Sequence, residues 1–211
     1  MKKIAYFAAA ALLLFSCTNE NNEDDGSMGK DGSLGDDGFA TVDMGLSVKW
    51  AEANLGAIAP EDYGNYYAWG ETEPKTSFKR NNYTYFSSPL TLPSSEDAAQ
   101  AELKGKWRMP TAQEWTELIE NSIITWETRN GINGALVTSR KNGASIFLPA
   151  AGYFLEASTK PYRESSVGNY WSSSRGEDVN NNKASIAQFE DNYYSLSDTY
   201  RFEGLPIRPV R

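Results

Sequence analysis

Carboxylates are the side chains in this sequence with the greatest capacity for chemistry, since the chain has 28 Asp and Glu residues and no histidine. The lack of histidine excludes imidazole bases, histidine–zinc sites and the usual serine triad. Glu177-Asp178 and Glu190-Asp191 are adjacent acid pairs that could act on a glycosidic bond. Adjacent residues on a strand point to opposite faces, which weakens both pairs. The carboxylates therefore predict no enzyme activity, and a carbohydrate-active enzyme is the less favoured alternative.

Oxygen-bearing side chains are concentrated in one segment near the C-terminus. They are Glu177, Asp178, Asn180, Asn181 and Asn182. Such oxygens are ligands for calcium, which is a hard cation. The spacing matches no fixed calcium-loop pattern, so the segment is interpreted as a polar solvated loop without metal, and calcium is kept as the alternative. No glycine-rich phosphate loop or dinucleotide fingerprint occurs, and Gly131-Ile132-Asn133-Gly134 is interpreted as a turn. No cofactor is expected.

The segment from Asn169 to Phe202 has the composition of an adaptable binding surface. It is mostly Asn, Tyr, Ser and Asp; tyrosine supplies contact area at little entropic cost, and small polar groups supply hydrogen bonds. Trp171, Ile186 and Phe189 can form the inward face, because the side chains of a strand alternate between faces. We expect a glycan or protein ligand, with a polar surface that has no specific ligand as the alternative. The predicted ligand-binding residues are Asn169, Arg175, Asp178, Asn180, Asn182, Asp191, Asn192 and Tyr194.

The N-terminus has the pattern of an exported protein. Lys2 and Lys3 precede an apolar run, residues 4–15, that is shorter than the roughly 20 residues of a membrane-spanning helix. Residues 1–16 are therefore interpreted as a signal peptide. The sequence Leu14-Phe15-Ser16-Cys17 resembles the bacterial lipobox, in which the cysteine carries the lipid, so Cys17 is the predicted lipidation site and membrane anchor. Cys17 is the only cysteine in the chain, and no disulfide can form within it.

Residues 17–38 are predicted to be an acidic, glycine-rich tether. Thr18 to Asp25 is an acidic run that resembles the surface-export signal of lipoproteins in the Bacteroides group, which implies an outer-membrane location facing the cell exterior. Glycine recurs at every third position from Gly26 to Gly38, as it does in a collagen-like stalk. Five triplets without proline are too few for such a stalk, so the segment is interpreted as a flexible spacer.

The remaining residues, 39–211, fall in the usual size range of one domain. The whole chain has a net charge of −8 at pH 7, which excludes nucleic acid as an expected partner. With no cysteine in this range, the predicted core must be stable without disulfides.

Local patterns within this domain predict an α+β fold dominated by antiparallel strands. Thr111 and Glu114 form a capping box before a helix over 112–121, and 94–104 is a second helix. The turn Lys141-Asn142-Gly143 predicts a hairpin between 135–139 and 145–148. Further strands are expected over 42–44, 48–53, 66–69, 170–174, 184–189, 193–197 and 205–210.

Six blocks of the domain, in order, resemble the Fibrobacter succinogenes major paralogous domain. They are Val42-Asp43-Met44-Gly45-Leu46-Ser47-Val48-Lys49-Trp50, Tyr66-Tyr67-Ala68-Trp69-Gly70-Glu71, Trp107-Arg108-Met109-Pro110-Thr111, Leu148-Pro149-Ala150-Ala151-Gly152-Tyr153, Tyr170-Trp171-Ser172-Ser173-Ser174 and Ile207-Arg208-Pro209-Val210. Alternation of apolar residues in and next to these blocks predicts a core position for five tryptophans: Trp50, Trp69, Trp107, Trp115 and Trp171. Trp126 lies outside the blocks, and the pattern does not decide its exposure.

The segment from Trp107 to Trp115 is also similar to part of the formylglycine-generating enzymes, which have a C-type-lectin-like fold. This resemblance implies the same fold for residues 39–211, with the ligand face in its C-terminal part. It does not imply the chemistry of those enzymes, because they oxidise with cysteine thiols and this domain has none. The expected function is therefore that of a non-catalytic binding or adhesion lipoprotein, with a structural surface lipoprotein as the alternative.

Overall fold

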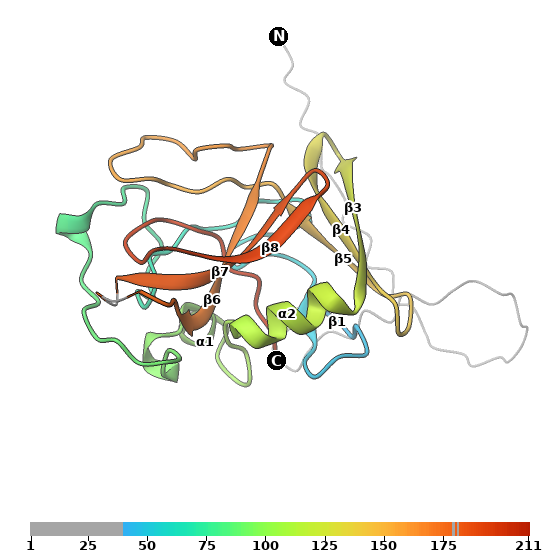
Figure 1. Ribbon diagram of the computed structural model, residues 1–211, viewed down its shortest axis with the longest axis horizontal. Coiled ribbons are helices and arrows are strands. Elements are labelled where there is room, and N and C mark those ends of the chain that lie inside the picture. The colour runs from blue at the N-terminus through green and yellow to red at the C-terminus, as the bar shows by residue number, and fades with distance from the viewer. Residues whose placement is uncertain (1–39, 179, 181) are drawn as a thin grey trace, which may run out of the picture. The chain divides into compact units, whose positions relative to one another are not determined.

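The computed structural model describes residues 40–178, 180 and 182–211, and this part of the chain has a mixed α+β fold (Figure 1). Its strands are mostly short and antiparallel, which confirms the predicted class. The predicted signal peptide, Cys17 and the tether lie outside the described residues. Three sheets are present within the described part: β1 (Thr41–Val42) with β2 (Trp50–Ala51); β3 (Ser122–Arg129), β4 (Ile132–Ser139) and β5 (Ser145–Pro149); and β6 (Gly168–Arg175), β7 (Lys183–Glu190) and β8 (Tyr193–Tyr200).

The second sheet is built from two consecutive hairpins. The hairpin between β4 and β5 turns at Lys141-Asn142-Gly143, as predicted, and Gly143 has a positive φ of 75°. The hairpin between β3 and β4 was not predicted. Its turn is Asn130-Gly131, and residues 132–134 already belong to β4, so the interpretation of 131–134 as a turn is wrong beyond Gly131. Trp126, on β3, is half-buried against the core.

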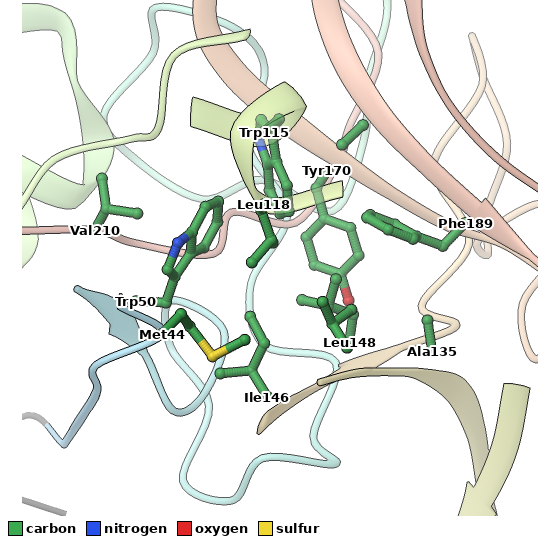
Figure 2. Packing of buried hydrophobic residues seen from close by; sticks show 12 residues of the cluster. Met44, Trp50, Trp115, Leu118, Ala135, Ile146, Leu148, Tyr170, Phe189 and Val210 are labelled. Atoms are coloured by element: carbon green, nitrogen blue, oxygen red, sulfur yellow. The ribbon is translucent and has the colours of Figure 1, made fainter. Parts of the chain in front are cut away.

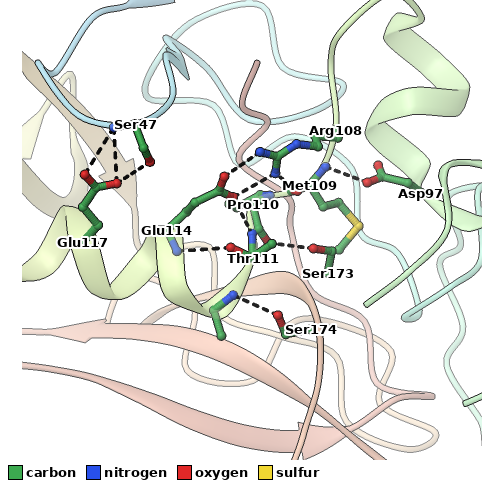
Figure 3. Close-up of polar contacts among 11 residues, drawn as sticks. Ser47, Asp97, Arg108, Met109, Pro110, Thr111, Glu114, Glu117, Ser173 and Ser174 are labelled. Carbon is green, nitrogen blue, oxygen red and sulfur yellow. Dashed lines mark hydrogen bonds and ion pairs between the residues drawn. The ribbon is translucent and has the colours of Figure 1, made fainter. Parts of the chain in front are cut away.

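The helix α2 (Ala112–Glu120) begins with the predicted capping box. The Thr111 hydroxyl accepts from the Glu114 amide, and the Glu114 carboxylate accepts from the Thr111 amide (Figure 3). The Glu114 carboxylate also accepts a hydrogen bond from the Arg108 guanidinium. Burial alone would raise the pKa of this carboxylate, but the hydrogen bonds from Arg108 and the Thr111 amide outweigh it, and the pKa is lowered. Glu114 therefore fixes the helix to the segment before it.

The predicted helix over 94–104 is divided in two. A 3-10 turn, η2 (Ser94–Glu96), is followed by α1 (Ala98–Leu103). Asp97 lies between them; its carboxylate accepts from the Gln100 amide as the N-cap and from the Met109 amide at 2.8 Å (Figure 3). Burial raises the pKa of Asp97, although these backbone donors oppose the shift. A second 3-10 turn is η1 (Arg80–Asn82).

The third sheet separates two apolar clusters. Cross-strand partners share a face, so Tyr170 and Ala187 point to one side of the sheet, and Trp171 and Ile186 point to the other. The first core cluster lies on the Tyr170 side and contains Trp115 of α2, whose ring contacts Tyr170 and Phe189 (Figure 2). The second lies on the Trp171 side. The predicted core tryptophans are confirmed, since each has 0% exposure: Trp50, Trp69, Trp107, Trp115 and Trp171.

Two predicted strands, 66–69 and 205–210, form only isolated bridges. Tyr67 pairs with Leu205, and Val210 pairs with both Trp50 and Arg108. Pro206 and Pro209 lack the amide hydrogen that a continuous ladder needs. The C-terminal segment therefore lies between other segments of the chain as an irregular but fully buried stretch.

Arg208, in this C-terminal segment, is completely buried. Its guanidinium donates to Asn54 Oδ1 at 2.9 Å and to the carbonyls of Ala51 at 3.1 Å, Glu52 at 2.6 Å and Phe147 at 2.7 Å. Burial lowers its pKa to about 10, which still leaves it charged at neutral pH. One side chain thus supplies donors for backbone carbonyls of both the N-terminal region and β5.

Replacing Arg208 with methionine is expected to cost about 3–5 kcal/mol of stability, because the carbonyls of Ala51, Glu52 and Phe147 would lose this donor. Urea unfolding of the full chain measures this loss. Arg140→Met is the matched control: Arg140 is exposed and donates to the Ser122 carbonyl, so its loss should change stability by less than about 1 kcal/mol. Equal unfolding midpoints for the two variants would contradict the role assigned to Arg208.

Candidate functional site

The structure divides the predicted ligand-binding residues between the two ends of the third sheet. Arg175, Asp178, Asn180 and Asn182 are at the end where β6 is connected to β7. Asn169, Asp191, Asn192 and Tyr194 are at the end where β7 turns into β8. The eight residues of β7 separate these ends by roughly 26 Å, at about 3.3 Å per residue. They cannot form one compact site.

The segment Tyr83 to Leu90 completes the connection end, although none of its residues was predicted to bind a ligand. Arg175 donates its amide to the Leu90 carbonyl at 2.9 Å, and Thr91 forms a bridge with Ser174. We use the name connection surface for Tyr83–Leu90 together with residues 175–178, 180 and 182. Figure 1 shows the green loop that follows η1 beside the β6–β7 connection.

Two large apolar side chains are exposed on the connection surface. Phe86 is 81% exposed and Leu90 is 74% exposed. The Phe86 ring contacts only the edge of Tyr83 among the aromatic rings of the described residues, with centroids 6.0 Å apart. Exposed apolar groups on a loop that is bonded to Arg175 have the character of an interaction site.

Arg201 lies beneath the connection surface and holds its two parts together. Its guanidinium donates to the Ser87 carbonyl at 3.0 Å, to Ser88 Oγ at 3.1 Å and to the Lys183 carbonyl at 3.1 Å, and it lies 4.4 Å from the Trp69 ring centroid. Burial lowers the pKa of Arg201. Since these donors are all engaged, Arg201 is a positioning residue for the loop.

Arg175 reaches the same loop from the end of β6. Its Nη1 donates to the Ser88 carbonyl at 3.1 Å, and the side chain is half-exposed. Its positive charge therefore remains at the loop that carries Phe86 and Leu90. The proximity of Arg175 also contributes to the lowered pKa of Arg201.

The β6–β7 connection uses part of its polar character for its own structure. The Asp178 carboxylate accepts from the Asn182 amide at 3.0 Å, and the Glu177 amide donates to Asp198 at 2.9 Å. The side chains of Asn180 and Asn182 are exposed, as expected of ligand-binding residues. Of the predicted calcium ligands, Asn181 lies outside the described residues. In the part of the chain that the structure describes, no three acidic, cysteine or histidine side chains gather closely enough to hold a metal ion.

At the other end, three of the four predicted residues reach water. Asp191 and Asn192 form the exposed β7–β8 turn, where Asn192 has a φ of 60° and donates to Asp191 Oδ1 at 2.8 Å. Tyr194 is 46% exposed. The expectation that Asn169 reaches water is wrong: it is 5% exposed, because both faces of β6 are covered by core at this position.

The sequence did contain a signal for the loop 83–90, which was not among the predicted binding residues. Tyr83-Thr84-Tyr85-Phe86-Ser87-Ser88 has the same tyrosine- and serine-rich composition as the C-terminal segment. Its participation depends on contacts with residues almost ninety positions away, which no local pattern encodes.

Comparisons of the sequence with protein-family models, with curated proteins and with solved structures find no match. Within the described residues, no helix is both long and apolar enough to cross a membrane.

Arg201→Met should make the segment 83–90 more mobile, because Ser87 and Ser88 lose the guanidinium donors. The free energy of unfolding of the whole domain should change less, because the methionine side chain still packs against Trp69. Amide hydrogen exchange of the full chain should become faster in this segment, with little change in α2. Arg163→Met, which removes a guanidinium at the opposite end of the sheet, serves as the control. Unchanged exchange at residues 83–90 would show that Arg201 does not position the loop.

Proposed function

We propose that the protein is a surface-exposed lipoprotein whose domain binds a protein ligand without catalysis, through the connection surface. The single observation that carries this proposal is the exposure of Phe86 and Leu90 on the loop whose Ser88 carbonyl accepts from Arg175. Protein interfaces are enriched in aromatic and arginine anchors within a polar rim. Asp178, Asn180 and Asn182 supply such a rim.

Rigid support of this surface favours binding. The loop is tied to the sheet through Leu90, Ser87 and Ser88, each of which bonds Arg175 or Arg201. A loop that is already ordered loses less entropy when a partner binds. Both arginines donate mainly to backbone carbonyls, which leaves loop side chains such as Phe86 free for contact.

The geometry of the acid pairs supports a non-catalytic role. Glu190 is ion-paired with Arg163, whose hydrogen bond lowers the pKa of that carboxyl. A carboxyl held ionised in this way is a poor general acid. Asp191 stands on the exposed turn, and Glu177 and Asp178 belong to an exposed connection, so neither pair lines an enclosed cleft.

The membership of residues 39–211 in the major paralogous domain family, with its C-type-lectin-like fold, is part of the proposal. It is supported by where the six family blocks lie, since they supply four of the five core tryptophans, all but Trp115, and the buried Arg208. The export signal, the lipid on Cys17 and the outward-facing outer-membrane location are proposed from the sequence of residues 1–25.

The double variant Phe86→Ala/Leu90→Ala is expected to bind its protein ligand with an affinity at least about 30-fold lower, because the truncation of anchor residues causes the largest losses of affinity in an interface. Intact cells that display the full chain would be tested for adhesion to immobilised fibronectin, laminin, collagen and mucin. The melting temperature of the double variant should stay close to that of the parent, since exposed substitutions change stability by about 0.5 kcal/mol each.

The matched control is Ile58→Ala, because Ile58 is 98% exposed on a different loop. This variant should adhere like the parent. Full adhesion by the double variant, or an equal loss of adhesion in the control, would refute the proposed site. If cells that display the parent chain adhere to none of the four immobilised proteins, the proposed binding function would be refuted.

The lipid anchor is tested separately by Cys17→Ser. The variant should leave the membrane fraction, because no thiol remains to carry a diacylglyceryl group, and the parent should show the mass of the lipid in mass spectrometry. A variant that stays in the membrane, together with a parent that has no lipid, would refute the lipoprotein assignment.

A further inference from the structure

The two outer strands of the second sheet have different surroundings. β5 forms one edge, and its carbonyls are engaged: Phe147 accepts from Arg208, and Pro149 accepts from the Tyr170 hydroxyl. β3 forms the other edge, and within the described residues no segment except β4 pairs with it (Figure 1). An uncovered edge strand presents a row of backbone donors and acceptors to any strand that can reach it.

A hydrogen bond at the start of β3 shows which of its residues face the open edge. The Asn121 carbonyl accepts from the Arg140 amide at 2.8 Å and therefore faces β4. Successive residues of a strand direct their backbone groups to opposite sides, so the even-numbered residues of β3 face away from β4. The Ser122 carbonyl accepts from Arg140 Nε at 3.0 Å. The backbone groups that no other segment of the described chain bonds are those of Ile124, Trp126 and Thr128.

β3 lacks the features with which edge strands usually avoid pairing. It contains no proline and no lysine, and its register with β4 runs without a bulge from Ser122 to Arg129. Its two charged residues, Glu127 and Arg129, form an ion pair with each other, so the strand is neutral. By contrast β8, the outer strand of the third sheet, has Asp198 as its one charged residue, and an unbalanced charge on an edge strand opposes pairing with a copy of itself.

The side chains of β3 also leave apolar area uncovered. Ile124 and Trp126 point to the core face of the sheet, where they are only half-buried against the first core cluster. Ile123, on the opposite face, is 50% exposed. A strand that paired with β3 would extend the sheet and place its own side chains beside Ile124 and Trp126.

We propose that β3 pairs antiparallel with the β3 of a second copy of the chain, which gives a two-fold symmetric homodimer with one continuous sheet. In such a pair, hydrogen-bonded positions must join residues that both face the open edge. A two-fold axis at Thr125 meets this condition, because it brings Ile124 opposite the partner's Trp126 and Trp126 opposite the partner's Ile124. Cross-strand pairs of an aromatic and a β-branched residue are favourable.

The charges of β3 favour the same register. An axis at Thr125 places Glu127 opposite the partner's Ile123 and leaves no two like charges opposed. An axis at Glu127 would place two carboxylates directly opposite each other, which is unfavourable. An axis at Trp126 would place Ile124 opposite the partner's Thr128 and lose the pairing of the two apolar residues. The dimer involves a different sheet from the connection surface, and it does not depend on the function proposed for that surface.

Thr125→Cys tests the register in the full chain, purified in detergent and treated with a mild oxidant. The two introduced thiols would be directly opposed in a non-hydrogen-bonded pair, whose Cα atoms lie about 4.5 Å apart, within the range of a disulfide. Non-reducing electrophoresis should therefore show a covalent dimer. Ile123→Cys is the matched control on the same face of β3. In the proposed register its thiols are four positions apart, roughly 13 Å at about 3.3 Å per residue, and cannot be joined.

Both cysteine variants keep Cys17, so a disulfide through Cys17 would appear equally in the two. A covalent dimer that forms in Thr125→Cys and not in Ile123→Cys supports the proposed pairing. Equal cross-linking of the two variants, or none in Thr125→Cys, would overturn it.

Analytical ultracentrifugation of the full chain in detergent tests the dimer without introduced thiols. The parent should sediment as a dimer. Thr125→Lys should raise the dissociation constant by about fivefold or more, because it opposes two like charges on an edge strand. Ser145→Lys is the matched control, since Ser145 is exposed on β5 in the same cross-strand row as Ile123, and it should dimerise as the parent does. A parent that sediments as a monomer, or equal dissociation constants for the two lysine variants, would overturn the proposal; adhesion through the connection surface would be unaffected.

Discussion

The fold depends above all on the burial of one positive charge, that of Arg208. Moving a guanidinium out of water is costly unless every donor direction finds an acceptor. Here the acceptors are Asn54 and the carbonyls of Ala51, Glu52 and Phe147, which come from segments far apart in the chain. These segments must therefore be assembled together around the C-terminal residues, and the irregular stretch 205–210 becomes as well fixed as a strand.

The third sheet is the second constraint, because it lies between the two apolar clusters. Its strands β6 and β7 bury side chains on both faces, as shown by Tyr170 and Trp171, which are adjacent and both 0% exposed. A polar residue on these strands consequently has little access to water. Recognition by this sheet is confined to its two ends and to the exposed residues of β8, and this explains why the predicted binding residues are separated into two groups.

Arginines stabilise both ends of the sheet, but in different ways. At the connection end, Arg201 is buried and donates to carbonyls, so it fixes a loop without neutralising an acid. At the turn end, Arg163 is ion-paired with Glu190 near the surface, where such a pair contributes little to stability but leaves no net charge. One end therefore presents apolar groups on a loop bonded to Arg175, and the other presents Asp191 and Asn192 beside exposed tyrosines.

The sequence by itself determined the features that depend on residues a few positions apart. The capping box of Thr111 and Glu114, the hairpin turn at Lys141-Asn142-Gly143 and the strand periods of β6, β7 and β8 were all predicted, because their stabilising contacts are local. The apolar alternation around the tryptophans predicted a core position for the same reason. Only the tertiary structure decided which polar residues face water. Asn169 is buried because a second apolar cluster covers its face of β6, and Phe86 belongs to the candidate site because Arg175 and Arg201 bond its loop from a distant part of the chain. Burial of a side chain is set by what packs against it, and that neighbour is specified by the whole fold and not by the residues on either side.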